Sequence, residues 1–155
     1  MHKSILKKQE ILEMAAECKV HFLNPNAVRQ NQSLGDHTGI TGFGFHRIAI
    51  EPGRESTELH RHTFEDECVY ILQGVAEVQI GEEQYSVAEG DFIGYPAGGL
   101  PHTMKNTGDE LLVCIVVGQR LDHDICDYPN KGKRLHRNRG LPWELVDLGD
   151  ITHPR

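Results

Sequence analysis

Residues 53–74 read GRESTELHRHTFEDECVYILQG, and residues 90–106 read GDFIGYPAGGLPHTMKN. Each stretch begins with a glycine, carries histidine beside a turn, and otherwise has the composition of β-strand. Four of their side chains are candidate metal ligands: His60, His62, Glu67 and His102. Neutral imidazole and carboxylate are the ligands that Mn, Fe, Ni, Cu and Zn share. The two stretches therefore predict a metal site.

Strand alternation brings these side chains onto one face. His60 and His62 are two residues apart, so both point to the same side of a strand. Glu67 follows a short turn and has the parity of the apolar residue Val69, which predicts that it faces the same interior. His102 arrives from a different hairpin. Ligands drawn from separate strands of a closed barrel would be held rigidly.

A His-x-His pair alone is weak support for a metal site, because the chain has ten histidines. Such a pair also fits a partly exposed strand with two solvated rings. Two additions favour the metal. Glu67 precedes an apolar strand that ends at Gly74, and the second stretch adds His102. Glu65 and Asp66 could substitute for Glu67, but they belong to the turn.

Short apolar segments separated by glycine-rich turns occupy the middle of the chain. They cover residues 45–50, 68–72, 75–80, 84–87, 91–95 and 111–117. This spacing is typical of an all-β barrel or sandwich. Segment 111–117 is apolar on both faces, so its outer face is expected to be covered by an N-terminal helix or by a second copy of the protein.

The flanks are less regular. Apolar residues within 3–19 recur at a rough helical period, which predicts a helix that ends before Asn24-Pro25-Asn26. The glycine-rich segment 35–44 predicts a loop. Beyond Gly118 the strand pattern weakens, so an irregular tail is expected there.

The tail contains a basic run: Lys131, Lys133, Arg134, Arg137 and Arg139. We interpret it as a solvated segment that pairs with the acidic surface. The alternative is an anion site, formed as the tail folds over the barrel mouth.

The order of residues in the two stretches resembles the two motifs of the cupin superfamily, G-x(5)-H-x-H-x(3,4)-E-x(6)-G and G-x(5)-P-x-G-x(2)-H-x(3)-N. The matching residues are Gly53, His60, His62, Glu67 and Gly74 for the first motif, and Gly90, Pro96, Gly98, His102 and Asn106 for the second. Two spacings are longer by one residue, and both extra residues fall in turns, where insertions are tolerated.

The resemblance covers about residues 45–117 and is that of a small single-domain (type-2 conserved barrel) cupin of unassigned activity. It implies an all-β double-stranded β-helix, or jelly-roll barrel, that holds one divalent metal and commonly forms a dimer. We therefore expect one cupin domain over residues 1–155. Its barrel core would span about 43–118, with a short helix in an N-terminal arm (3–19) and an irregular C-terminal extension (119–155).

Composition limits the remaining function classes. The net charge of −7 disfavours a nucleic-acid partner. No apolar run approaches the roughly 20 residues of a membrane span, and the first ten residues are too polar for a secretory signal. The four cysteines form no Cys-x-x-Cys pair, and a cytoplasmic chain of this size does not need disulfides. A cytoplasmic homodimer without a membrane partner is expected.

Three imidazoles and a carboxylate leave coordination positions open, whereas structural zinc sites are closed and usually rich in cysteine. We predict one divalent ion (Mn, Fe, Ni or Zn) that binds a small oxygen-rich molecule, such as an organic acid or a sugar derivative. The protein would then be a metal-dependent dioxygenase, isomerase, decarboxylase or lyase. The alternatives are a non-catalytic binding or sensing module with the same site, and a scaffold stiffened by its metal.

The sequence alone assigns no catalytic residue. His46 is the histidine outside the motifs that could point into the barrel, because its strand directly precedes the first motif. Tyr95 could reach the pocket. Met104 and Asn106 share the parity of His102, so they could line the cavity.

Overall fold

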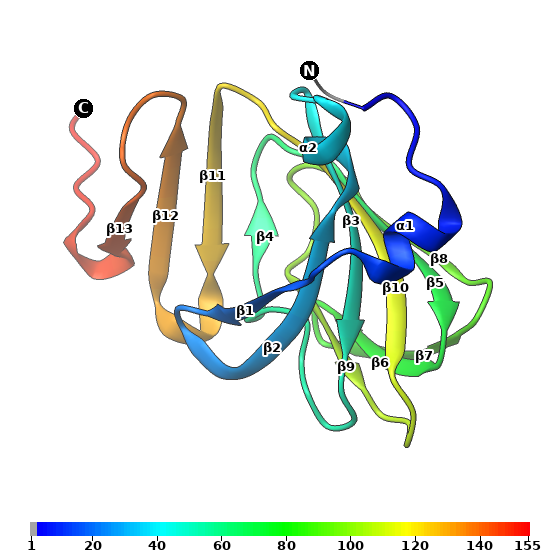
Figure 1. Ribbon diagram of the computed structural model, residues 1–155. Coiled ribbons are helices and arrows are strands. Elements are labelled where there is room, and N and C mark those ends of the chain that lie inside the picture. Colours follow the sequence, from blue (N-terminus) through cyan, green and yellow to red (C-terminus); the bar gives the residue numbers. More distant parts are fainter. Residues whose placement is uncertain (1–2) are drawn as a thin grey trace.

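The largest sheet of the computed structural model, which describes residues 3–155, has six antiparallel strands (Figure 1). Its strands, in spatial order, are β1 (Glu17–His21), β2 (Asn24–Ser33), β3 (Phe43–Ile50), β10 (Leu112–Gln119), β5 (Glu67–Gln73) and β8 (Phe92–Tyr95). The long central strand β10 pairs with β3 on one side and with β5 on the other. Segments far apart in the sequence therefore meet in this sheet.

A second, three-stranded sheet closes the barrel. Its strands are β7 (Glu83–Ala88), β6 (Val75–Ile80) and β9 (His102–Asn106), in that order. The inner faces of the two sheets share one apolar core, whose buried members include Ile48, Ile50, Val69, Ile71, Val78, Ile93, Met104 and Leu112. The prediction of an all-β barrel is confirmed, and Glu67 shares the inward face with Val69 as expected.

The turn between β5 and β6 depends on Gly74. Its φ is +90°, and a Cβ atom there would lie 2.8 Å from the carbonyl oxygen of Leu111. Both the backbone conformation and the lack of space favour glycine over any other residue.

The prediction of a short helix in the N-terminal arm is confirmed, but the helix is shorter than the helical period within residues 3–19 indicates. Helix α1 covers only Lys8–Glu13, and residues 17–33 form the hairpin β1–β2. The helix buries no residue, and Leu12 stays 53% exposed. No packing against the barrel therefore stabilises a longer helix. Residues 17–20 instead pair with β2, and backbone pairing of this kind overrides a weak helical period.

The segment expected to be a loop contains a single helical turn. Helix α2 (Leu34–Thr38) ends at Gly39, whose φ is +81°. The left-handed conformation of this glycine terminates the helix.

The prediction of an irregular C-terminal tail is wrong. Strands β11 (His123–Tyr128), β12 (Lys133–Asn138) and β13 (Glu144–Asp147) form a sheet with the short strand β4 (Arg61–His62), and two 3₁₀ turns, Pro129–Lys131 and Leu148–Asp150, follow β11 and β13. Figure 1 shows this sheet to one side of the barrel.

Charge pairing stabilises the C-terminal sheet beside a small apolar cluster of Cys126, Tyr128 and Leu135. Asp124 lies opposite Arg137 and Asp127 opposite Arg134 in the β11–β12 register, and both pairs form ion pairs. Opposite charges directly across an antiparallel ladder stabilise it. The basic run thus pairs with acidic residues, as the interpretation of a charge-paired segment predicted. The tail is folded, however, and β11 pairs with the strand that carries His62.

No helix within residues 3–155 is both long enough and apolar enough to cross a membrane.

Candidate metal centre

The predicted ligands come from three places in the barrel. His62 lies in β4, Glu67 begins β5 and His102 begins β9. His60 pairs with His102 through two backbone hydrogen bonds, His60 N to His102 O at 3.1 Å and His102 N to His60 O at 2.8 Å. This pairing places the two imidazole rings side by side, with centroids 4.6 Å apart.

The Glu67 carboxylate lies between the histidines. Its Oε1 is 3.7 Å from His102 Nε2, and its Oε2 is 4.0 Å from His62 Nε2. The potential ligand atoms of His60, Glu67 and His102 all lie within 4.8 Å of one another. His62 lies at the side of this group, with its ring centroid 5.0 Å from that of His60. The structure therefore brings His60, Glu67 and His102 together and places His62 beside them, within 4.0 Å of the Glu67 carboxylate.

Hydrogen bonds orient each imidazole in the same way. Nδ1 of His60 and Nδ1 of His102 each face the backbone carbonyl two residues earlier, at 2.9 and 3.4 Å. Nδ1 of His62 lies 2.7 Å from Asp124 Oδ2. A ring that donates from Nδ1 presents an unprotonated Nε2, which is the form that ligates metals.

The buried polar atoms fit a divalent ion. His102 Nε2 is buried and has no hydrogen-bond partner among residues 3–155. Burial lowers the pKa of His60 to about 3, so this ring is neutral at pH 7. Burial on its own would raise the pKa of Glu67, but the three histidines outweigh it and bring that pKa to about 2. An ionised carboxylate beside the neutral imidazole of His60 is a pair of donors suited to a divalent metal.

Asp124, which the sequence did not single out, supports the centre from the C-terminal sheet. It is fully buried, contacts His62 Nδ1, accepts from Phe64 N at 3.0 Å, and pairs with Arg137 at 2.9 Å. Burial favours the neutral acid, but these contacts outweigh it and lower the pKa of Asp124. Asp124 is therefore ionised, and its carboxylate fixes the orientation of the His62 ring.

We expect the substitution Asp124→Asn to weaken metal affinity about 10- to 100-fold, because partners that orient a ligating histidine have effects of this size. Asparagine keeps the shape of the side chain and can still accept from Phe64 N. Competition with a chelator measures the affinity. The control is Asp122→Asn, which removes an exposed carboxylate paired with Arg139. Equal metal affinities for the two variants would contradict this role.

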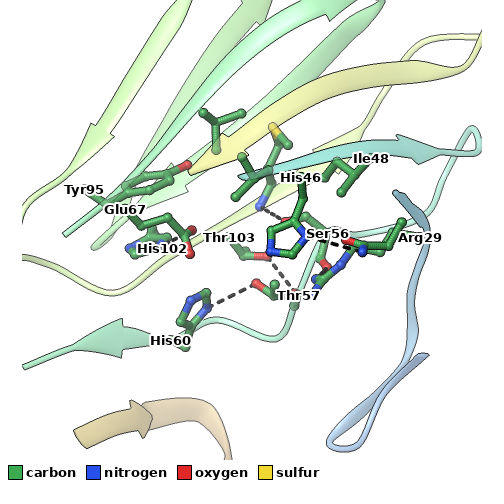
Figure 2. Close-up of a pocket in the computed structure, with 14 residues that line it drawn as sticks. Arg29, His46, Ile48, Ser56, Thr57, His60, Glu67, Tyr95, His102 and Thr103 are labelled. Carbon is green, nitrogen blue, oxygen red and sulfur yellow. Dashed lines mark hydrogen bonds and ion pairs between the residues drawn. The ribbon is translucent and has the colours of Figure 1, made fainter. Parts of the chain in front are cut away.

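The centre lies where two cavities meet. An inner cavity of about 80 Å³ and an outer cleft of about 330 Å³ share Arg29, Thr57, His60 and Glu67 in their walls. Figure 2 shows Glu67, His60 and His102 on one side of the inner cavity, with His46 and Arg29 on the other.

Further side chains complete the wall of the inner cavity. Polar groups in its wall are Asn31, His46, Ser56, Thr57 and Thr103. Tyr95 stacks on His102, with ring centroids 3.5 Å apart and planes 4° from parallel, which holds this imidazole in place.

Three of the four residues that the sequence proposed as possible wall residues line the cavity: His46, Tyr95 and Met104. Asn106 does not. It is buried and donates to the carbonyls of Ile50 and Glu110 at 2.8 Å, so its role is structural.

The sequence did not predict Arg29 or Asn31 as site residues. Both lie on β2, with side chains on the same face as the buried Ala27. No signal in the sequence marks them, because β2 carries polar residues on both faces.

Comparisons with known proteins agree with this architecture. The family model described as "Cupin domain" matches residues 46–118. A crystal structure from Acidithiobacillus ferrooxidans, described as a "Putative sugar phosphate isomerase", is 53% identical, with a TM-score of 0.95. That similarity covers 99% of this chain and 97% of the other.

Two further comparisons are more distant. A structure from Silicibacter pomeroyi, described as a sugar phosphate isomerase from a cupin superfamily, is 23% identical, covers 90% of this chain and 92% of its own, and has a TM-score of 0.80. An uncharacterized protein from Methanocaldococcus jannaschii is 35% identical over 69 residues, and the match spans 43% of this chain and about half (54%) of that protein. The motifs, the barrel and these similarities together show that the chain belongs to the cupin superfamily.

Proposed function

We propose that the protein is a metal-dependent isomerase of a small sugar derivative, with one divalent ion held by His60, His62, Glu67 and His102. The observation that carries the proposal is the convergence of unprotonated ring nitrogens and an ionised carboxylate at the junction of two cavities. The name of the relative that is 53% identical, a putative sugar phosphate isomerase, favours isomerisation over the other reactions open to such a centre.

A divalent ion at this centre would polarise a carbonyl group and orient the adjacent hydroxyl of the substrate. The chain supplies the rest of the binding site. The Thr57 and Thr103 hydroxyls line the inner cavity and donate to backbone carbonyls at 3.0 and 2.8 Å, which leaves the hydroxyl oxygens as acceptors; that of Thr57 lies 3.1 Å from His60 Nδ1. Such acceptors suit the hydroxyl groups of a sugar.

Isomerisation between an aldose and a ketose also needs a base. The base removes a proton from the carbon next to the carbonyl and returns it to the former carbonyl carbon, while the proton of the adjacent hydroxyl moves to the former carbonyl oxygen. His46 is the histidine of the inner cavity outside the ligand set. Burial, and then the charge of Arg120, lower the pKa of His46 below its usual value, so the ring is neutral at pH 7. A neutral imidazole accepts a proton, and we assign this role to His46.

Nuclear magnetic resonance in D₂O tests the proposed reaction. Metal-loaded protein is incubated with aldoses, ketoses and their phosphates. We expect interconversion of one aldose–ketose pair, with deuterium entering at the carbon next to the carbonyl. A compound that binds and returns unchanged, without deuterium, would instead favour the non-catalytic binding module. Consumption of O₂ or release of CO₂ would indicate a different metal-dependent reaction.

We also propose a homodimer formed by the outer face of the six-stranded sheet. Tyr70 of β5 lies opposite Phe92 of β8, and the two side chains are 45% and 66% exposed on the face away from the core. Helix α1 does not cover them. It is fixed to β2 by Gln32 Nε2, which donates to the carbonyls of Ile11 and Met14. Exposed aromatic residues of this kind are typical of an interface.

Light scattering is expected to give a mass of twice 17.5 kDa for the natural chain and one chain mass for Phe92→Glu. Tyr85→Glu is the control, since Tyr85 is exposed on β7 in the other sheet. A monomeric natural chain, or a dimeric Phe92→Glu variant, would exclude this interface.

We place the protein in the cytoplasm, where the free thiols of Cys114 and Cys126 are stable.

A further inference from the structure

Arg29 is a largely buried cation that forms no ion pair with any carboxylate of residues 3–155. Its Nη1 donates to the carbonyl oxygen of Ser56 at 2.7 Å. Five other arginines, 61, 120, 134, 137 and 139, each pair with an aspartate or a glutamate. Burial lowers the pKa of Arg29 from its ordinary value, although the group stays charged. A desolvated charge without a partner is unfavourable until an anion joins it.

The Arg29 side chain lies where a bound ligand could contact it. It lines both the inner cavity and the outer cleft, across from the candidate metal ligands (Figure 2). The charge of Glu67, which also lines both cavities, favours the protonated form of Arg29, but no ion pair joins the two side chains. The Glu67 carboxylate lies 4.0 and 3.7 Å from His62 and His102. The guanidinium has five donors, and one of its nitrogens is bonded to the Ser56 carbonyl.

A second cation lies beside it. Lys19 of β1 is directly opposite Arg29 of β2 in the ladder, so the two side chains share a face, and both line the outer cleft. Like charges directly opposite each other destabilise a strand pair. Lys19 has only a partly exposed contact with Glu17 at 3.4 Å, and such pairs contribute little. His21, which also lines the cleft from β1, is neutral at pH 7, because burial brings its pKa to about 4.

We propose that Arg29, assisted by Lys19, binds the phosphate group of a phosphorylated substrate whose sugar oxygens reach the metal centre. This inference deepens the proposed function and rests on it for the metal end of the substrate. A phosphate monoester matches two adjacent cations, since it is close to a dianion at pH 7, and the planar guanidinium binds phosphate through paired hydrogen bonds. The outer cleft, about 330 Å³, has the size of a small-ligand site.

Inorganic phosphate titrated into metal-free protein tests Arg29 separately from the metal. We expect Arg29→Gln to weaken phosphate binding about 10- to 100-fold by calorimetry, the usual effect of losing charge-assisted hydrogen bonds. Lys19→Gln is expected to weaken it less. The matched control is Arg54→Gln, which removes the same charge from a residue that donates to Asn26 and lines neither cavity. The control should stay within about twofold of the natural chain.

Three results would overturn the inference: no phosphate binding by the natural chain, unchanged binding by folded Arg29→Gln, or an equal loss in Arg54→Gln. Should Arg29→Gln not fold, Arg29→Lys replaces it. That variant keeps the charge without the planar fork, so a measurable loss of phosphate affinity is still expected, and unchanged affinity would overturn the assignment. Metal content of the Arg29 variants should equal that of the natural chain. A chain that binds phosphate through Arg29 but no metal would defeat the proposed function and leave this site standing.

Discussion

The double substitution His60→Ala and His62→Ala is expected to reduce the bound metal from about one divalent ion per chain to less than about a tenth. The two rings supply half of the predicted ligand set, and both lie in or beside β4. Elemental analysis of protein purified without added metal measures the content directly. The metal found in purified protein need not be the physiological metal. The affinity of any such site for divalent ions rises along the Irving–Williams series, whatever metal the protein uses in the cell.

Thermal unfolding supplies a second measurement. An ion that binds only the folded chain stabilises it by about 2.7 kcal/mol at 100 times its dissociation constant. Added metal should therefore raise the melting temperature of the natural chain and leave that of the double variant unchanged.

The control for this experiment is His37→Ala with His123→Ala, because both of these histidines are exposed and distant in sequence from the motifs. The control should retain the metal and the thermal shift. A His60/His62 variant that still carries one ion per chain would mean that the metal lies elsewhere.

The barrel and the four candidate ligands could be predicted because their signals are local. Two histidines one residue apart share a strand face whatever surrounds them, and the turn glycines bound each strand. His60 and His102 are 42 positions apart, yet each lies in a recognisable stretch, so their meeting followed from the resemblance to a known barrel.

The supporting residues could not be predicted, because nothing local distinguishes them. Asp124 contacts a histidine 62 residues away, and in its own strand it lies opposite Arg137. A charged residue in such a strand looks the same in sequence as a charged residue in a solvated tail. Arg29 had the same difficulty, since β2 carries polar residues on both faces. Only the folded chain shows which of these groups are buried beside the centre.

His46→Gln is expected to lower the isomerisation rate about 10²- to 10⁴-fold, the usual contribution of a general base. Glutamine can keep a hydrogen bond to Ser33, which lies 2.8 Å from His46 Nδ1, so the wall of the cavity should hold its shape. Metal content and phosphate affinity should stay at natural values, because His46 belongs to neither predicted binding set. The control is His136→Gln on β12, a histidine that lines neither cavity.

The pH profile separates a base from a merely structural residue. A base must be deprotonated to act, and burial lowers the pKa of His46 from its usual value of about 6.5. The rate of the natural chain should therefore hold through pH 6.5 and decline only as the pH falls through that lowered pKa. His60 and Glu67 have pKa values of about 3 and 2, so loss of the ligand set is expected only at strongly acid pH. The decline assigned to His46 should disappear in His46→Gln, leaving a slow rate that is flat over the same range. Two results would show that His46 is not the base: a His46→Gln variant with the natural rate, or one with a reduced rate that still declines at acid pH as in the natural chain. The base would then be another group of the cavity.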